Sequence, residues 1–216
     1  MNQVRNYQKE LDKIIERLTQ KGEVPTLLLH SCCAPCSSYC LEYLRQYFKI
    51  TVFYYNPNIS MEEEYRKRVA EQKRLIAAYN AQNIFYPIEV IEGDYDTDAF
   101  YAIAKGLEKC REGGERCFAC YELRLRKTAQ LAADMGADYF TTTLTISPLK
   151  NAAKLNEIGE RLSGECHIPW LVSDFKKKNG YKRSIELSAE YELYRQDYCG
   201  CIYSKMERES QKKERT

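Results

Sequence analysis

Residues 27–37, Leu-Leu-Leu-His-Ser-Cys-Cys-Ala-Pro-Cys-Ser, contain the features from which the architecture of this 216-residue chain can be inferred. The run from Val24 to His30 is almost wholly apolar, which is typical of a short strand buried on both faces. Pro35 favours the first turn of a helix. Three thiols are therefore expected in a strand-to-helix turn, where helical amides lower the pKa of a thiol and favour the thiolate that binds metal.

Helical and extended patterns alternate outward from this turn. Helices are expected over 4–21, 35–46, 60–80, 98–110, 118–135, 152–162 and 183–196, and strands over 24–30, 50–55, 85–91, 139–144 and 169–172. Ser60 and Glu63 form a capping-box pattern at the start of the third helix. Strands separated by helices imply right-handed crossovers and a parallel sheet covered on both faces.

The pattern thus predicts an α/β fold, a single three-layer domain of Rossmann-like type, similar to the ATP-pyrophosphatase arrangement. We expect an N-terminal helix over 1–22 packed on the domain, one catalytic domain over 23–204, and a charged flexible tail over 205–216. Ligands of such sheets bind beyond the carboxyl ends of the strands, where strand order reverses. Cys32 and Cys33 are expected at that point.

Composition favours a cytoplasmic protein with functional cysteines. The chain has ten cysteines, 44% hydrophobic residues, and a formal net charge of +2, and it shows neither a signal-peptide pattern nor a long apolar run. In a reducing compartment, clustered thiols usually bind metal or take part in catalysis. The near-neutral charge does not by itself indicate a polyanionic partner.

Two cysteine pairs together supply four sulfur ligands. Adjacent Cys32 and Cys33 are expected to point apart and to reach different irons of one cluster, and Cys117-x-x-Cys120 follows a glycine turn at the start of a helix. Four thiolates are the usual ligand set of a four-iron cluster, and zinc is the alternative. Cys36 stands at chelate spacing from Cys33, so it can replace one member of the first pair. The alternative for these thiols is burial as small hydrophobic residues.

Cys199-Gly-Cys201 differs in kind from the other pairs. A disulfide across one residue closes a small strained ring, which makes it labile and suited to catalysis, and the same thiols can instead hold a second metal. Isolated Cys40, Cys110 and Cys166 fit buried faces of helices or strands. His30 ends the first strand and is interpreted as a packed histidine, with hydrogen-bond or proton donation as the alternative.

The combined motifs resemble the cobalamin-independent epoxyqueuosine reductases, the QueH family. They are Cys-Cys-Ala-Pro at 32–35, Arg-Cys-x-x-Cys-Tyr-x-x-Arg-Leu at 116–125 and Tyr-Cys-Gly-Cys at 198–201, and the likeness extends through 53–59 and 141–148. It covers about residues 26–203.

This resemblance implies an oxidoreductase that removes the epoxide oxygen of epoxyqueuosine at the wobble position of tRNA with a GUN anticodon. It implies a [4Fe-4S] cluster on Cys32, Cys33, Cys117 and Cys120, redox-active or second-metal thiols at Cys199 and Cys201, and no cobalamin. Removal of the oxygen needs two electrons, whereas a four-iron cluster ordinarily passes one at a time, so a second redox element is needed: the dithiol, or a second iron ion that it holds. The resemblance leaves open the electron donor and the proton donor.

A tRNA substrate gives the basic clusters of the sequence a role. The alternative is a solvated charged face. We expect phosphate contacts and stacking on a splayed base from the following side chains: Lys176, Lys177, Lys178, Arg183, Arg124 and Tyr121.

Two rival functions fit part of the pattern. A nucleotide-dependent tRNA-modifying enzyme of ATP-pyrophosphatase type would share the fold, but the sequence has neither G-x-x-x-x-G-K-[ST] nor S-G-G-x-D-S, and cysteines stand where glycines would bind phosphate. A non-enzymatic zinc-binding module would share the cysteines. Zinc thiolate is colourless, whereas an iron cluster absorbs visible light.

Overall fold

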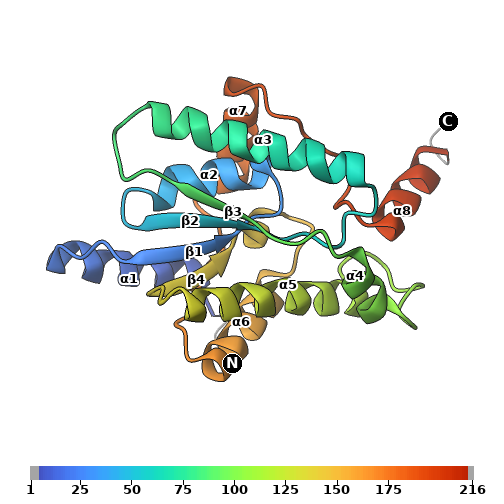
Figure 1. Cartoon of the computed structure of the whole chain (residues 1–216), viewed down its shortest axis with the longest axis horizontal. Helices are drawn as coiled ribbons and strands as arrows, with labels where there is room; N and C mark the ends of the chain where they lie inside the picture. Colours follow the sequence, from blue (N-terminus) through green and yellow to red (C-terminus); the bar gives the residue numbers. More distant parts are fainter. Residues whose placement is uncertain (1–4, 214–216) are drawn as a thin grey trace.

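The computed structural model describes residues 5–213 and has the predicted three-layer α/β architecture. Its helices and strands follow one another in this order: α1 (Tyr7–Lys21), β1 (Thr26–His30), α2 (Ala34–Leu44), β2 (Lys49–Tyr54), α3 (Glu62–Ala81), β3 (Glu89–Glu92), α4 (Thr97–Ala104), α5 (Glu115–Asp134), β4 (Tyr139–Thr142), the 3-10 helix η1 (Thr143–Ile146), α6 (Ala152–Cys166), α7 (Gly180–Glu190) and α8 (Ile202–Lys213). Helices α2, α3 and α7 lie on one side of the sheet, and α5 and α6 on the other (Figure 1).

The four strands are all parallel and run in the order β3-β2-β1-β4. Successive strands β1, β2 and β3 extend the sheet in one direction, and β4 then pairs with the free edge of β1. Strand order therefore reverses between β1 and β4, and the turn that follows β1 lies at the predicted ligand-binding point.

The middle of strand β1, Leu27–Leu29, is apolar because both faces of the strand are covered. Leu27 and Leu29 belong to a core cluster that includes residues of α1, α2 and α3, whereas Leu28 belongs to a second cluster built mainly on α5 and α6. Helix α1 is held at its ends by the Asn6 side chain, which accepts from the backbone of Lys9, and by Gly22 in the left-handed conformation.

The predicted helix at Ser60 exists, but its capping box is wrong. Helix α3 begins after Met61, which makes no side-chain cap. The backbone and hydroxyl of Ser60 instead donate to the carbonyl oxygen of Gly200, at 3.1 and 3.4 Å. Ser60, which the local sequence predicts to cap the helix, instead forms a tertiary contact with the C-x-C segment.

Other boundaries also differ from the sequence expectation: the strand expected over 85–91 begins at Glu89, the strand expected over 139–144 ends at Thr142, and the helix expected over 183–196 ends at Glu190. The strand expected over 169–172 is reduced to an isolated bridge between Phe140 and Trp170. The helix expected over 98–110 ends at Ala104. Residues 205–213, expected within a flexible tail, belong to α8, and the remainder of that tail lies outside the described residues. The domain limits given above stay a prediction.

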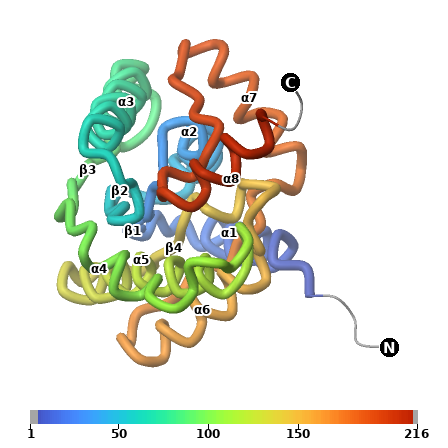
Figure 2. The backbone as a smooth tube through the Cα atoms, turned by 90° about the vertical axis from the view of Figure 1, so that its right-hand side faces the viewer, coloured from blue at the N-terminus to red at the C-terminus, as the bar shows by residue number. Residues whose placement is uncertain are grey.

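Helix α8 lies at one end of the layers. Figure 2, viewed from the right-hand side of Figure 1, shows α8 in front of them, with α3 to one side and α5 below. No helix among residues 5–213 has both the length and the apolar character that crossing a bilayer requires.

Candidate metal centre

The turn after β1 is fixed by a buried network of hydroxyl groups. Ser31 and Ser37 contact each other at 2.6 Å, and both donate to the side-chain carbonyl oxygen of Gln72 in α3, at 2.8 and 3.0 Å. Cys33 is the extended N-cap of α2, and its carbonyl oxygen accepts from Ser37. The three cysteines of this turn therefore project from a backbone that is anchored on both sides.

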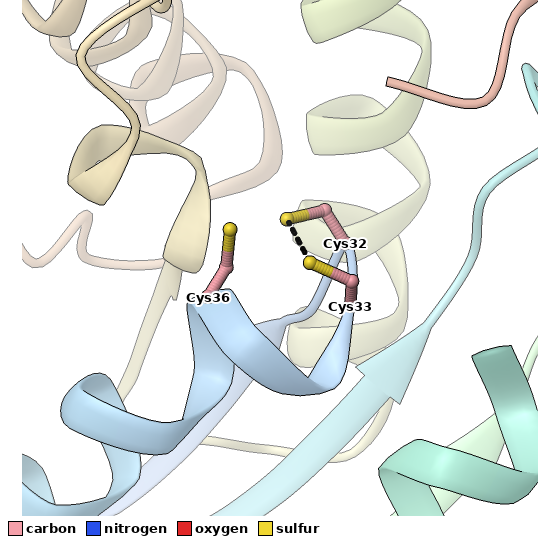
Figure 3. A group of neighbouring side chains, drawn as sticks. All are labelled: Cys32, Cys33 and Cys36. Carbon is pink, nitrogen blue, oxygen red and sulfur yellow. Dashed lines mark hydrogen bonds between the residues drawn. The ribbon is translucent and has the colours of Figure 1, made fainter. Parts of the chain in front are cut away.

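Cys32, Cys33 and Cys36 form a compact sulfur group (Figure 3). Their Sγ atoms all lie within 4.8 Å of one another, and those of Cys32 and Cys33 are 3.8 Å apart. The expectation that Cys32 and Cys33 point apart is wrong, because their sulfurs lie side by side, 3.8 Å apart (Figure 3). Cys36 lies one helical turn into α2, which places its sulfur beside them.

One negative charge is favoured within this group. Hydrogen bonds with Cys33 and Cys36 hold the pKa of Cys32 well below its ordinary value, and Thr143 contributes by donating to its Sγ at 3.5 Å. Hydrogen bonding to Cys32 raises the pKa of both Cys33 and Cys36, and burial raises both further. The group thus presents one thiolate flanked by two thiols, a soft donor set that suits iron–sulfur clusters or zinc.

The second predicted pair begins helix α5. The backbone amide of Gly113 donates to the Sγ of Cys117 at 3.2 Å, and burial raises the pKa of both Cys117 and Cys120. Cys117 belongs to the core cluster against which Cys32 packs, and Cys120 shares a smaller cluster with Cys201. One cysteine of the CxxC pair thus shares a cluster with Cys32, and the other shares a cluster with the C-x-C segment.

Cys199 and Cys201 are free thiols with sulfurs 3.4 Å apart. The pKa of Cys199 is lowered to about 5 by its hydrogen bond with Cys201 and also by the positive charge of Lys150. The carbonyl oxygen of Cys199 accepts from Asn58 at 3.3 Å and from Arg68 at 3.2 Å. This segment is thus held against the loop after β2 and against α3, with one thiol poised as a thiolate.

A cavity of about 490 Å³ joins the first sulfur group to Cys199, because Cys32, Cys33, Cys36 and Cys199 line it; Cys117, Cys120 and Cys201 are not among its lining residues. Cysteines far apart in the sequence therefore meet at the carboxyl end of the sheet. In the part of the chain that the structure describes, the cysteines whose sulfurs fall within 4.8 Å of one another as a set of three are Cys32, Cys33 and Cys36. The four-ligand set that includes Cys117 and Cys120 stays a prediction.

Buried cations face the thiols. Arg124 lies in the cavity wall and donates to Asn56 at 3.2 Å, and the charges of Cys120 and Cys32 raise its pKa although burial lowers it. The pKa of Lys150 is likewise raised, since Cys199 and nearby charges outweigh burial. These groups balance the negative charge of thiolates in a low-dielectric site.

Sequence reasoning missed several of these residues. Lys150 forms an ion pair of 3.4 Å with Glu112 and is largely buried, yet it lies in a loop with no pattern of its own. Thr143 contacts Cys32 and Asn56 contacts Arg124. The one usable signal was that Asn56 and Thr143 fall within the two stretches that carry the family likeness, 53–59 and 141–148.

The predicted substrate residues are scattered. Arg124 lines the cavity, but the other five residues do not. Lys178 pairs with Asp12 at 2.7 Å, Arg183 pairs with Glu42 at 2.6 Å, and Lys176 pairs with the neighbouring Asp174. Lys177 is exposed. Tyr121 is 1% exposed, and its hydroxyl group has no hydrogen-bond partner among the described residues.

The remaining candidates behave as packed residues. His30 is fully buried, and burial lowers its pKa to about 3, so the neutral ring bonds to the hydroxyl of Thr142 at 2.8 Å and the carbonyl of Tyr55 at 3.1 Å. Cys40 is 0% exposed within the core. Both agree with the structural interpretation.

Known proteins match this chain over nearly its whole length. The sequence model of the family "Epoxyqueuosine reductase QueH" matches residues 27–207. A protein of that name from Staphylococcus epidermidis is 44% identical over 207 residues, covering 95% of this chain and 87% of its own length. Proteins of the same name from Streptococcus pyogenes and Thermotoga maritima are 41% and 34% identical, covering 94% and 85% of this chain and 79% and 92% of themselves. With its thiols gathered at the switch point of the sheet, the chain belongs to the QueH family.

Proposed function

We propose that this protein is an epoxyqueuosine reductase that converts epoxyqueuosine to queuosine in tRNA. Its relatives carry that activity in their name. The observation that carries the proposal is the meeting of Cys32, Cys33, Cys36 and Cys199 in one cavity, with Cys120 and Cys201 packed together beside it. The thiols must stay reduced to work, which suits the cytosol.

The donor chemistry fits an iron–sulfur cluster. Cys32 and Cys33, with Cys117 and Cys120, would hold a [4Fe-4S] cluster, and the grouping of the three sulfurs makes Cys36 a candidate for one of these places. Such a cluster supplies one-electron transfer and a Lewis-acidic iron. Cobalamin is not required by this proposal.

The dithiol balances the reaction. Conversion of an epoxide to an alkene and water takes up two electrons and two protons. Oxidation of the Cys199 thiolate and the Cys201 thiol to a disulfide releases two electrons and one proton, and solvent supplies the second proton. The sulfurs lie 3.4 Å apart, and the Cys199 thiolate is stabilised by Lys150. A reductant then restores the dithiol. The alternative is that these thiols hold a second iron ion.

Matched cysteine variants test this division of roles. Cys117→Ser and Cys199→Ser are purified anaerobically with Cys166→Ser as control, because Cys166 is a half-buried thiol outside the cavity. Iron, sulfide and visible absorbance are quantified, and tRNA nucleosides are analysed after incubation with dithiothreitol.

We expect Cys117→Ser to lose iron and colour, and Cys199→Ser to keep both while losing turnover. Equal iron loss in the two variants would contradict the separate redox role. A colourless, zinc-containing wild-type protein without turnover would contradict the reductase proposal itself. The iron content of Cys36→Ser tests whether Cys36 is a ligand: loss of iron would make it one, and unchanged iron would leave Cys32 and Cys33 as the ligands.

A further inference from the structure

The cavity is far more cationic than the chain as a whole. The formal net charge of all 216 residues is only +2. The cavity nevertheless has two acidic side chains, Glu112 and Asp197, against five cationic ones: Arg68, Arg124, Lys150, Arg195 and Arg208. The three that are largely buried, Arg68, Arg124 and Lys150, face the thiols or their backbone. Arg195 and Arg208 are more accessible and lie on segments close to the surface.

Arg195 and Arg208 lack the carboxylate partners that other surface arginines have. Arg195 donates to the Ser188 hydroxyl at 2.9 Å, and Arg208 donates to the Gln211 side chain at 3.2 Å. Within residues 5–213, no carboxylate forms an ion pair with either guanidinium. By comparison, Arg161 and Arg66 are each paired with two glutamates, and Arg183 is paired with three. Two guanidinium groups at the mouth of one cavity therefore keep their capacity for an anion.

Aromatic rings lie beside these arginines. Tyr181, at the start of α7, is 37% exposed, and Tyr198 precedes Cys199; both line the cavity. Exposed aromatic rings and unpaired arginines are the pair of features that bind the bases and phosphates of single-stranded RNA. A volume of about 490 Å³ is within the range of sites that enclose one small ligand.

We propose that Arg195 and Arg208 bind the phosphates that flank the nucleotide entering the cavity. This inference rests on the proposed function, since it takes the wobble nucleotide of an anticodon loop as the occupant. It places the RNA interface at the cavity mouth, between the segment before Cys199 and α8, and not on the loop of Lys176–Lys178. Lys178 and Lys176 of that loop are paired with Asp12 and Asp174, whereas neither Arg195 nor Arg208 forms an ion pair among residues 5–213.

Binding of RNA without chemistry tests the inference. A fluorescein-labelled anticodon stem-loop with a GUN anticodon is titrated with anaerobically purified protein at several KCl concentrations, using wild type, Arg195→Gln, Arg208→Gln and the control Arg161→Gln. Each mouth variant should bind about tenfold more weakly at about 0.1 M salt. The slope of log affinity against log salt should fall by about 0.7 for each single-strand phosphate that the variant no longer neutralises.

Turnover separates this inference from the function on which it rests. With epoxyqueuosine-containing tRNA, the mouth variants should raise KM and leave kcat at saturation close to that of wild type. Affinity and salt slope equal to those of Arg161→Gln would overturn the inference, even if wild type turns over. Wild type that binds the stem-loop but never converts epoxyqueuosine would overturn the proposed function, while the salt slopes still decide the role of the two arginines.

Discussion

Substitution of Gly200 by alanine tests whether the C-x-C loop must lie where it does. Gly200 has φ +111°, a conformation that side chains rarely adopt. An added Cβ would lie 2.7 Å from Cγ1 of Ile59 and 3.3 Å from Nη1 of Arg68. The close approach is enforced by hydrogen bonds from Ser60 to the Gly200 carbonyl oxygen and from Arg68 to that of Cys199.

The cost can be estimated from these contacts. Left-handed backbone costs a non-glycine residue about 1–2 kcal/mol, and overpacking against Ile59 costs a further amount of about 1–3 kcal/mol. If the loop moves away to relieve the clash, it gives up the hydrogen bonds that anchor it, each about 0.5–1.5 kcal/mol. We therefore expect Gly200→Ala to lower the free energy of unfolding by about 2–5 kcal/mol. Displacement of the thiols should also lower kcat at least about tenfold, which corresponds to a rise of about 1.4 kcal/mol in the activation free energy.

The matched control is Gly106→Ala. Gly106 also has positive φ, +82°, but its added Cβ would meet nothing within 4 Å. It should show the backbone cost alone, about 1–2 kcal/mol, with normal turnover. Urea unfolding followed by circular dichroism gives the stability, and nucleoside analysis gives kcat. Equal losses in the two variants, with full activity in Gly200→Ala, would refute the idea that close docking of this loop positions the thiols.

Three further changes probe the surroundings of the centre. Lys150→Met should lower kcat about tenfold or more without loss of iron, because it removes the cation that stabilises the Cys199 thiolate. Lys154→Met, which loses the ion pair with Glu157 and the contact with the Phe118 ring, should leave kcat unchanged, and steady-state kinetics and visible spectra check both variants. Gly159→Ala should lower stability by about 1–3 kcal/mol in urea unfolding, because its Cβ would lie 2.3 Å from the ring of Trp170. Arg116→Gln should cost about 1–3 kcal/mol and speed proteolysis of the turn after α4, whose buried carbonyl oxygens the guanidinium now binds; an unchanged cleavage rate would contradict this.

The fold was largely predictable because its signals are local. The apolar run of β1 and the alternation of helix and strand indicated a parallel sheet buried on both faces, and the order β3-β2-β1-β4 confirms where Cys32 lies. The predictions of local structure failed where contacts with distant segments determine the conformation. Ser60 donates to Gly200 in place of capping its helix, and the segment around Trp170 pairs with β4 through one bridge.

The site was predictable in its thiols and not in its charges. Cysteine spacing identified the groups around Cys32 and Cys199, since sulfur ligands are rare and cluster visibly. The burial of Lys150 and Arg124 has no such signature in the sequence. A lysine or arginine that faces water cannot be distinguished by sequence pattern from one that faces a thiolate. Clustered lysines at 176–178 looked like an interface because the sequence does not show their partner Asp12 on α1.

The parallel sheet also sets the order in which the centre can be assembled during translation. Cys32, Cys33 and Cys36 leave the ribosome early. Strand β4, which completes the sheet beside β1, is synthesised much later, and the Cys199 segment, which lines the same cavity, follows near the C-terminal end. Until then the nascent chain exposes three clustered thiols to adventitious metals and oxidants. If the proposed cluster is held by thiols from both halves of the chain, its loading would follow folding as a separate maturation step.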